Sequence, residues 1–209
     1  MSKPVLYDYW RSSAAYRVRI ALNLKGVAYE SRVVSLIDGE QSRAENRARN
    51  PQGLVPTLEI DGHELTQSLA IIDYLDARYP DPALVSSDPA ARSRTLARAM
   101  VIAADIHPLD NLRVLKYLKN ELGHEQAAID TWYRHWIAEG FAALEAQAPD
   151  RGLFGGDTPD LSDICLVPQM YNARRFETDL APYPKLVRID AALNGQDAFA
   201  QATPEAVKP

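Results

Sequence analysis

The chain has 209 residues, of which 46% are apolar and 24% charged, which excludes a disordered or collagen-like chain and allows one sizeable core or two smaller ones. Its 23 Lys and Arg against 28 Asp and Glu give a net charge of −5, which offers no general attraction to a phosphate backbone. The only cysteine, Cys165, excludes a disulfide framework and a paired redox motif, and a reducing, cytoplasmic compartment fits this usage.

Targeting segments and common cofactor motifs are not expected. The amino-terminal residues lack the basic run and apolar stretch of a secretory leader, and no run approaches the ~20 apolar residues that span a bilayer. No common glycine-rich phosphate loop is present, and the four histidines lack metal-ligand spacing; they are His63, His107, His124 and His135. We therefore expect no metal, no nucleotide cofactor, no membrane and no nucleic acid as partners.

The first eighty residues alternate between strand and helix patterns. Residues 5–10 favour a strand, a helical stripe follows and ends at Gly26, and a second β-favouring run covers residues 29–36. This close spacing is typical of a crossover unit with two parallel strands. Residues 38–50 are polar and predict a loop or a poorly buried helix.

A hairpin and a helix complete this part of the chain. Asp61-Gly62 lies between two short apolar runs and predicts a turn that joins two antiparallel edge strands. From Ser68 a helical pattern runs to Tyr79, and Pro80 ends it. The predicted order is β-α-β-α-β-β-α.

Residues 81–89 form a short, polar stretch that contains proline, which predicts a linker. Strand patterns are absent after it, so residues 90–209 are predicted to form an all-helical domain. Asp160 to Asp163 predicts a capped helix start. Two further helical stripes are Leu96, Met100, Ala103, Leu109 and Leu112, interrupted at Pro108, and Ile129, Trp132, Trp136, Gly140 and Leu144. We expect Cys165 and the tryptophan pair to lie in the core.

Two of the predicted helix starts carry hydroxyl groups. Ser12 and Ser13 follow Arg11 at the first strand-to-helix junction, where backbone amides and the helix dipole favour an anion or a thiolate. Gln67 and Ser68 offer an amide and a hydroxyl to a carboxylate at the later helix. At both places the alternative is a helix cap without function.

Three other features have a functional and a structural interpretation. A cis Val55-Pro56 bond would turn the Val55 backbone outward to pair with a bound peptide, although proline is also tolerated at the start of a strand without function. Arg174-Arg175 predicts either a bidentate carboxylate site or a solvated face. His107, beside a helix-breaking proline, is either a site residue or a structural one.

Taken together, these residues resemble the zeta class of glutathione transferases over nearly the whole chain. The matching segments are Arg11 to Leu22, Asn50-Pro51 with Val55 to Leu58, Gln67 to Ile72, and Leu166 to Gln169 with Asn172 to Phe176. The resemblance implies a thioredoxin-like α/β domain over residues 1–80 that binds glutathione and an all-α domain over residues 90–209 that shapes the second substrate's pocket. It also implies a homodimer.

The resemblance assigns roles to individual residues. Ser12, with Ser13 beside it, would hydrogen-bond the glutathione sulfur, and Val55 would pair with the cysteinyl backbone. Gln67 and Ser68 would hold the γ-glutamyl end. Other matching positions that line the site are Gln41, His107, Asn111 and Arg113, and the candidates that would bind substrate carboxylates are Arg11, Arg175 and Arg113.

The implied activity is glutathione-dependent cis–trans isomerisation of maleylacetoacetate to fumarylacetoacetate by reversible thiolate addition. Many zeta enzymes carry cysteine where Ala14 stands here, so the chain would rely on the sulfur of glutathione alone. The alternatives are isomerisation of the shorter maleylpyruvate, conjugation of glutathione to electrophiles, and a transferase-fold binding protein without catalysis. Intact Ser12, Gln67 and Ser68 argue against the last.

Overall fold

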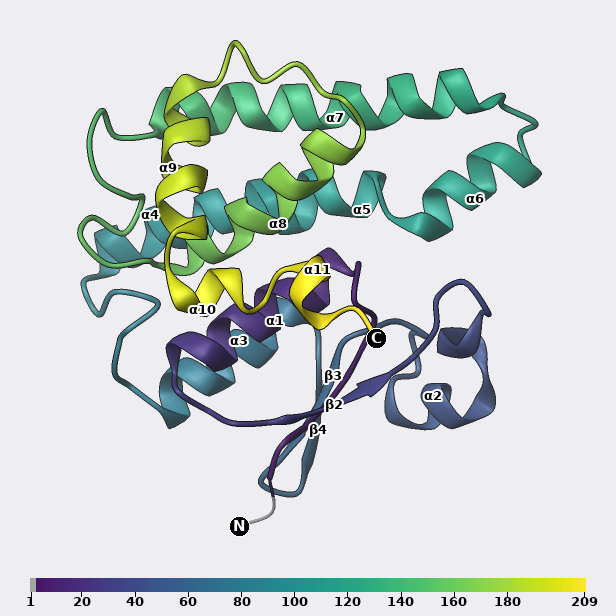
Figure 1. The fold of residues 1–209 in the computed structure, drawn as a ribbon, viewed down its shortest axis with the longest axis horizontal. Helices are drawn as coiled ribbons and strands as arrows, with labels where there is room; N and C mark the ends of the chain where they lie inside the picture. The colour runs from purple at the N-terminus through teal and green to yellow at the C-terminus, as the bar shows by residue number, and fades with distance from the viewer. Residues whose placement is uncertain (1–2) are drawn as a thin grey trace. The chain divides into compact units, whose positions relative to one another are not determined.

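The computed structural model describes residues 3–209, which form two compact units (Figure 1). The first unit contains the chain up to Ala83 together with Gly195–Pro209, and the second contains Leu84–Asn194. Among residues 3–209 no helix is long and apolar enough to cross a membrane, and no group of His, Cys, Asp or Glu side chains is arranged to hold a metal ion.

The first unit is built on a four-stranded mixed sheet. Its main elements are β1 (Val5–Asp8), α1 (Ser13–Leu24), β2 (Glu30–Val33), the 3-10 turn η1 (Glu40–Ser42), α2 (Ala44–Arg49), β3 (Thr57–Ile60), β4 (His63–Thr66) and α3 (Ser68–Arg78). The sheet order is β2-β1-β3-β4, with β1 parallel to β2 and β3 antiparallel to both of its neighbours. The predicted α/β order is therefore confirmed, and α1 and α3 lie side by side on one face of the sheet (Figure 1).

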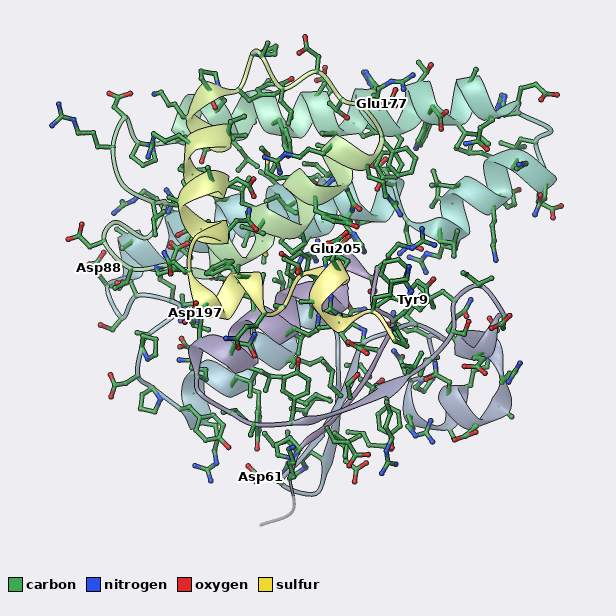
Figure 2. The ribbon with its side chains drawn as sticks, viewed as in Figure 1. Tyr9, Asp61, Asp88, Glu177, Asp197 and Glu205 are labelled. Atoms are coloured by element: carbon green, nitrogen blue, oxygen red, sulfur yellow. The ribbon has the colours of Figure 1, made fainter. Side chains whose placement is uncertain are left out.

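The hairpin departs from the prediction in one respect. Asp61, labelled in Figure 2, forms the predicted turn with φ of 51° and accepts hydrogen bonds from Tyr74 at 3.0 Å and Arg78 at 3.2 Å. Of the two hairpin strands, only β4 lies at an edge of the sheet, because β3 also pairs with β1. A local hairpin signal defines the turn but not which other strand will pair with its outer side.

A buried arginine joins α1 to the end of β1. Arg19 is fully buried, and its guanidinium donates to Asp8 Oδ2 at 2.8 Å and to the Trp10 carbonyl at 3.0 Å. Its Nε donates to the Ala202 carbonyl at 3.0 Å. The second carboxylate oxygen of Asp8 accepts from the Ser31 hydroxyl at 3.0 Å. The ion pair is therefore neutralised and largely satisfied by hydrogen bonds.

The C-terminal segment belongs to the first unit, whereas the sequence-based division placed it with the helical domain. Its helices are α10 (Asp197–Ala200) and α11 (Pro204–Val207), yellow in Figure 1, and α10 packs against α1. Phe199 and Ala202 are fully buried, and Asn23 donates to the Ala198 carbonyl at 2.9 Å. These long-range contacts leave no local pattern in the sequence.

The second unit is all-helical, as predicted. Its helices are α4 (Pro89–Met100), the π-helix η2 (Val101–Ile106), α5 (His107–Leu109), α6 (Leu112–Asn120), α7 (Gln126–Gln147), α8 (Leu161–Arg175) and α9 (Pro184–Asn194). The predicted interruption at Pro108 is misplaced, because helical structure continues to Leu109 and ends at Asp110 and Asn111. The preceding π-turn widens the helix, which accommodates a proline ring that cannot donate a backbone hydrogen bond.

The stripe predicted to begin on α4 is displaced from the buried positions, whereas on α7 the predicted Ile129 and Leu144 are buried and only the middle of the stripe is displaced by one residue. Met100 is 48% exposed and Leu112 41%, whereas Ala99, Ile102 and Ile106 are buried. On α7 the predicted Trp132 and Trp136 are half-buried, and the buried positions include Ile129, Tyr133, Ile137, Phe141 and Leu144. The tryptophans dominated the sequence pattern, but tertiary packing buries Tyr133, Ile137 and Phe141 in the middle of α7. Gly140 lies against η2, where an added Cβ would overlap the Ile106 side chain.

The start of α8 is as predicted. Asp160 accepts from the amides of Ser162 and Asp163, and the Asp163 carboxylate accepts in return from Asp160 at 3.0 Å. The same carboxylate also accepts from the Phe154 and Gly155 amides at 3.0 and 2.9 Å. Cys165, in the following turn, is fully buried, so its predicted core position is confirmed.

We predict that Arg19→Met lowers the free energy of unfolding by about 3–5 kcal/mol, because it leaves the buried Asp8 carboxylate without its cation. Urea unfolding followed by circular dichroism measures this loss. The matched control is Arg32→Met, which removes the exposed Arg32–Glu30 pair and should change stability little. Equal effects of the two substitutions would contradict a special role for Arg19.

Candidate active site

The turn between β1 and α1 presents the hydroxyl of Ser12 at the amino end of a helix. Ser12 is the N-cap, and its Oγ accepts from the Ala15 amide at 3.2 Å. Its own amide donates to the carbonyl of Tyr9, labelled in Figure 2, at 2.8 Å. A serine hydroxyl has one donor hydrogen besides its acceptor positions, and no residue among 3–209 accepts a hydrogen bond from Ser12. The cap and the anion site are therefore compatible interpretations of the same side chain.

The residues flanking Ser12 differ in exposure. Ser13 is buried and starts α1. The Arg11 guanidinium lies 4.7 Å from the centre of the Trp10 ring and reaches the Tyr9 hydroxyl at 3.5 Å. Arg11 Nε is buried and has no hydrogen-bond partner among the residues that the structure describes. An arginine so placed retains donors for an anion.

A second helix start lies beside the first. Ser68, buried at the beginning of α3, accepts from Arg17 Nη1 at 3.3 Å, and Arg17 follows Ser13 by one turn of α1. Gln67 precedes it with φ of 67°, a conformation rare outside glycine, and its side chain donates to Gln52 Oε1 at 2.6 Å. The amino ends of α1 and α3 are thus linked by a direct hydrogen bond. Unusual backbone angles of this kind concentrate at functional sites.

The loop before β3 is held by two buried asparagines. Asn46 and Asn50 both donate to the Leu54 carbonyl, at 3.4 and 3.1 Å, and Asn46 also donates to the Gln41 carbonyl at 3.0 Å. The Val55-Pro56 bond that follows is cis. Gln41 Oε1 is buried with no partner among residues 3–209. The structure thereby fixes the two candidate residues Gln41 and Val55 around one loop.

The remaining candidates lie in the second unit. His107 starts α5, and Asn111 caps α6 by accepting from the amide of the exposed Arg113 at 3.1 Å. Arg175 is exposed at the end of α8, and its guanidinium lies 4.7 Å from the centre of the Phe176 ring, which stacks on Tyr133. Arg174 instead pairs with the buried Asp190 on α9 at 2.6 Å. The two adjacent arginines therefore differ in their contacts: Arg174 is held by an ion pair, whereas Arg175 lies over an aromatic ring.

Comparison with known proteins identifies the family. Residues 6–83 match the family described as "Glutathione S-transferase, N-terminal domain". A probable maleylacetoacetate isomerase of Vibrio cholerae is 52% identical over 98% of this chain and 97% of its own length. A solved maleylpyruvate isomerase, described as a bacterial glutathione S-transferase of the zeta class, is 47% identical with a TM-score of 0.95 over 98% of both chains. The chain belongs to the zeta-class glutathione transferases.

One further solved relative is informative about ligands. Maleylacetoacetate isomerase from Anaeromyxobacter dehalogenans is 43% identical to this zeta-class transferase, with a TM-score of 0.88 over 99% of this chain and 97% of its own. It has been crystallised with glutathione in its active site, and separately with dicarboxyethyl glutathione and citrate. That protein therefore accommodates both a glutathione thioether and carboxylate groups.

Several polar residues of this zeta-class transferase were not among the sequence candidates. Arg17 and Gln52 support the amino end of α3, and Tyr133 stacks on Phe176, the residue after Arg175. Asp110, between α5 and α6, is only 7% exposed, and neither of its carboxyl oxygens has a hydrogen-bond partner among residues 3–209. Burial raises the pKa of Asp110 to about 8. No periodic pattern marks these positions, because each is defined by burial or by a partner distant in sequence.

The raised pKa makes Asp110 a pH-dependent stability element. The folded chain retains a proton that the unfolded chain releases near the ordinary value of 3.8, so stability falls as the pH rises from about 4 to about 8 and is level above that. We predict that Asp110→Asn removes this fall and is more stable than the parent by about 1–3 kcal/mol at pH 8, with little difference at pH 4. Urea unfolding across this pH range measures the difference, and a pH-independent difference would contradict the assignment.

Proposed function

We propose that this chain is a glutathione-dependent cis–trans isomerase that converts maleylacetoacetate to fumarylacetoacetate. The observation that carries the proposal is the Ser12 hydroxyl, which caps α1 and retains a hydrogen to donate where the helix dipole favours a negative charge. The strong similarity to isomerases of this name supports the choice of reaction. We further propose that it acts as a cytoplasmic homodimer, as the resemblance implies.

The residues of the first unit fit glutathione. Ser12 would donate to the sulfur and lower the pKa of the thiol, with the first-turn amides of α1 adding to the effect. Ser13 lies beside it. The backbone of Val55 would pair with the cysteinyl residue, and Gln67 and Ser68 would hold the γ-glutamyl carboxylate at the amino end of α3. The buried, unpartnered Gln41 Oε1 would accept a donor of the peptide.

The residues of the second unit and Arg11 fit the acid substrate. Bound glutathione supplies a thiolate whose reversible addition makes the double bond single, allows rotation, and leaves the thiol unconsumed. Arg11 and Arg175 would bind the substrate carboxylates, with Arg113 as a third cation. His107 and Asn111 would line the site. Because Ala14 provides no thiol, this chain's contribution is to bind, orient and stabilise charge.

The second candidate is isomerisation of maleylpyruvate. The solved maleylpyruvate isomerase of the zeta class, nearly as similar in sequence, favours it. Both substrates are cis unsaturated keto acids, so the same residues would bind either of them. Turnover of maleylacetone and maleylpyruvate, compared under the same conditions, separates them.

The proposal is tested by following the ultraviolet absorbance of maleylacetone with enzyme, with and without catalytic glutathione, and then titrating the remaining thiol. Loss of the cis substrate with the thiol retained is the expected result. Thiol consumed in proportion to product would instead indicate a conjugating transferase. A folded chain that neither reacts nor binds glutathione would indicate a binding protein.

We predict that Ser12→Ala lowers isomerase turnover at least tenfold more than Ser13→Ala, because only Ser12 carries the N-cap hydroxyl. Since Ser12→Ala also removes a cap, Ser12→Asp serves as a control that keeps the accepting oxygen but repels a thiolate. Ser12→Thr, which keeps both functions, should retain activity. Turnover and the pKa of bound glutathione, read from thiolate absorbance, check the ranking. A greater loss for Ser13→Ala would reverse the assignment.

We predict that Arg175→Met raises KM for the acid substrate about tenfold with a smaller change in kcat, because it removes a charge-assisted carboxylate contact. Methionine keeps most of the apolar stem, so the loss reports the charge. Arg94→Met, at an exposed position of α4, is the matched control and should leave KM unchanged. Steady-state kinetics at saturating glutathione measure both constants, and an unchanged KM for Arg175→Met would remove this residue from the site.

A further inference from the structure

The C-terminal segment of the first unit brings a lysine to the turn that carries Ser12. Lys208 is the C-cap of α11, and its Nζ lies 5.3 Å from the centre of the Trp10 ring. One arginine fixes both sides of this contact, because Arg19 donates to the Trp10 carbonyl and to the Ala202 carbonyl, each at 3.0 Å. The segment is therefore held beside the end of β1 by hydrogen bonds as well as by the lysine (Figure 1).

Two cations share the Trp10 ring. The Arg11 guanidinium lies 4.7 Å from the centre of the indole on which Lys208 also lies. A cation–π contact holds a charged side chain in place without neutralising it. Neither cation forms an ion pair with a carboxylate among residues 3–209, and Arg11 Nε is buried there without a hydrogen-bond partner. Two like charges on one ring repel each other, and an anion bound to both relieves this repulsion.

The position of these cations next to Ser12 indicates which carboxylate they bind. The thiolate adds to the carbon of the double bond that is β to the ketone, and that same carbon carries a carboxylate group. With the sulfur held by the Ser12 hydroxyl, this carboxylate lies only two bonds from the sulfur once the new bond has formed. The carboxylates of glutathione are separated from the sulfur by more bonds. Trp10 and Arg11 directly precede Ser12, so their turn faces the nearer group.

We propose that Lys208 is a further carboxylate-binding residue: together with Arg11 on the Trp10 ring, it binds the substrate carboxylate next to the double bond. The inference rests on the proposed function, since it takes a cis unsaturated keto acid as the ligand. The charge of this carboxylate is the same before and after thiolate addition. The effect of Lys208 should therefore appear in the affinity for the acid and not in the chemical step.

The first test is KM for maleylacetone, whose single carboxylate is the group next to the double bond, at saturating glutathione. Lys208→Met should raise this KM about threefold to tenfold and change kcat by less than about twofold, because methionine keeps an apolar contact with the indole and loses the charge. Lys208→Arg should restore the wild-type KM. The matched control is Lys3→Met, which removes an exposed lysine at the opposite end of β1 and should leave KM unchanged.

Two further readouts separate this role from its alternatives. KM for glutathione, at saturating maleylacetone, should be the same in Lys208→Met and in the wild type. A rise in that constant alone would assign Lys208 to a carboxylate of glutathione and overturn the assignment to the acid. Urea unfolding should give equal midpoints for all the variants. A raised KM for maleylacetone that came with a lowered midpoint and persisted in Lys208→Arg would indicate a structural role and also overturn the inference.

Binding without turnover distinguishes a failure of this inference from a failure of the proposed function. The affinity for malonate, in the presence of glutathione, is determined by calorimetry for the wild type, Lys208→Met, Lys208→Arg and Lys3→Met. Only Lys208→Met should bind malonate more weakly, by about threefold to tenfold. Equal affinities of all four proteins would overturn the inference. Malonate binding that depends on Lys208, in a protein that isomerises neither acid, would instead overturn the proposed function alone.

Discussion

The buried guanidinium of Arg19 is the constraint on which the geometry of the first unit depends. It satisfies Asp8 and the Trp10 carbonyl at the end of β1, and it also holds the Ala202 carbonyl of the C-terminal segment. The residues between Trp10 and α1 are therefore fixed at both ends. Ser12 lies in this short interval, so a buried ion pair helps to fix the backbone that carries its hydroxyl.

The serine hydroxyls at the two helix starts also have structural hydrogen bonds. Ser12 accepts a hydrogen bond as a cap, and Ser68 accepts one from Arg17, so each hydroxyl already has a structural use. A hydroxyl can accept and donate at the same time, which lets the local structure orient the group without consuming its donor. The structural and functional interpretations of these serines are alternatives when the sequence is considered alone. In the structure they are compatible, because one concerns the oxygen as an acceptor and the other the hydrogen as a donor.

The sequence allowed the element order and most candidate residues to be predicted, because turns, caps and periodicity are local. Asp61-Gly62 and Asp160 to Asp163 are examples in which the pattern lies within four residues of its effect. The predictions failed where a distant partner decided the outcome. The middle of the α7 stripe was placed one residue too early because tertiary packing buries Tyr133, Ile137 and Phe141 rather than the tryptophans. The C-terminal segment was placed with the helical domain because its contacts with the first unit, such as Arg19 with Ala202, join residues 183 positions apart.

A transferase that uses the sulfur of bound glutathione as its nucleophile needs no reactive thiol of its own, and this chain offers none at its first helix start. Its one cysteine is fully buried in α8, and Ala14 stands in the turn where a thiol would be accessible. What we propose remains for the protein is the placement of charge: a donor at Ser12 and the first turn of α1 in the first unit, and Arg175 as a cation in the second. A buried carboxylate without a hydrogen-bond partner is costly when ionised, and burial of Asp110 keeps its carboxyl group protonated at neutral pH.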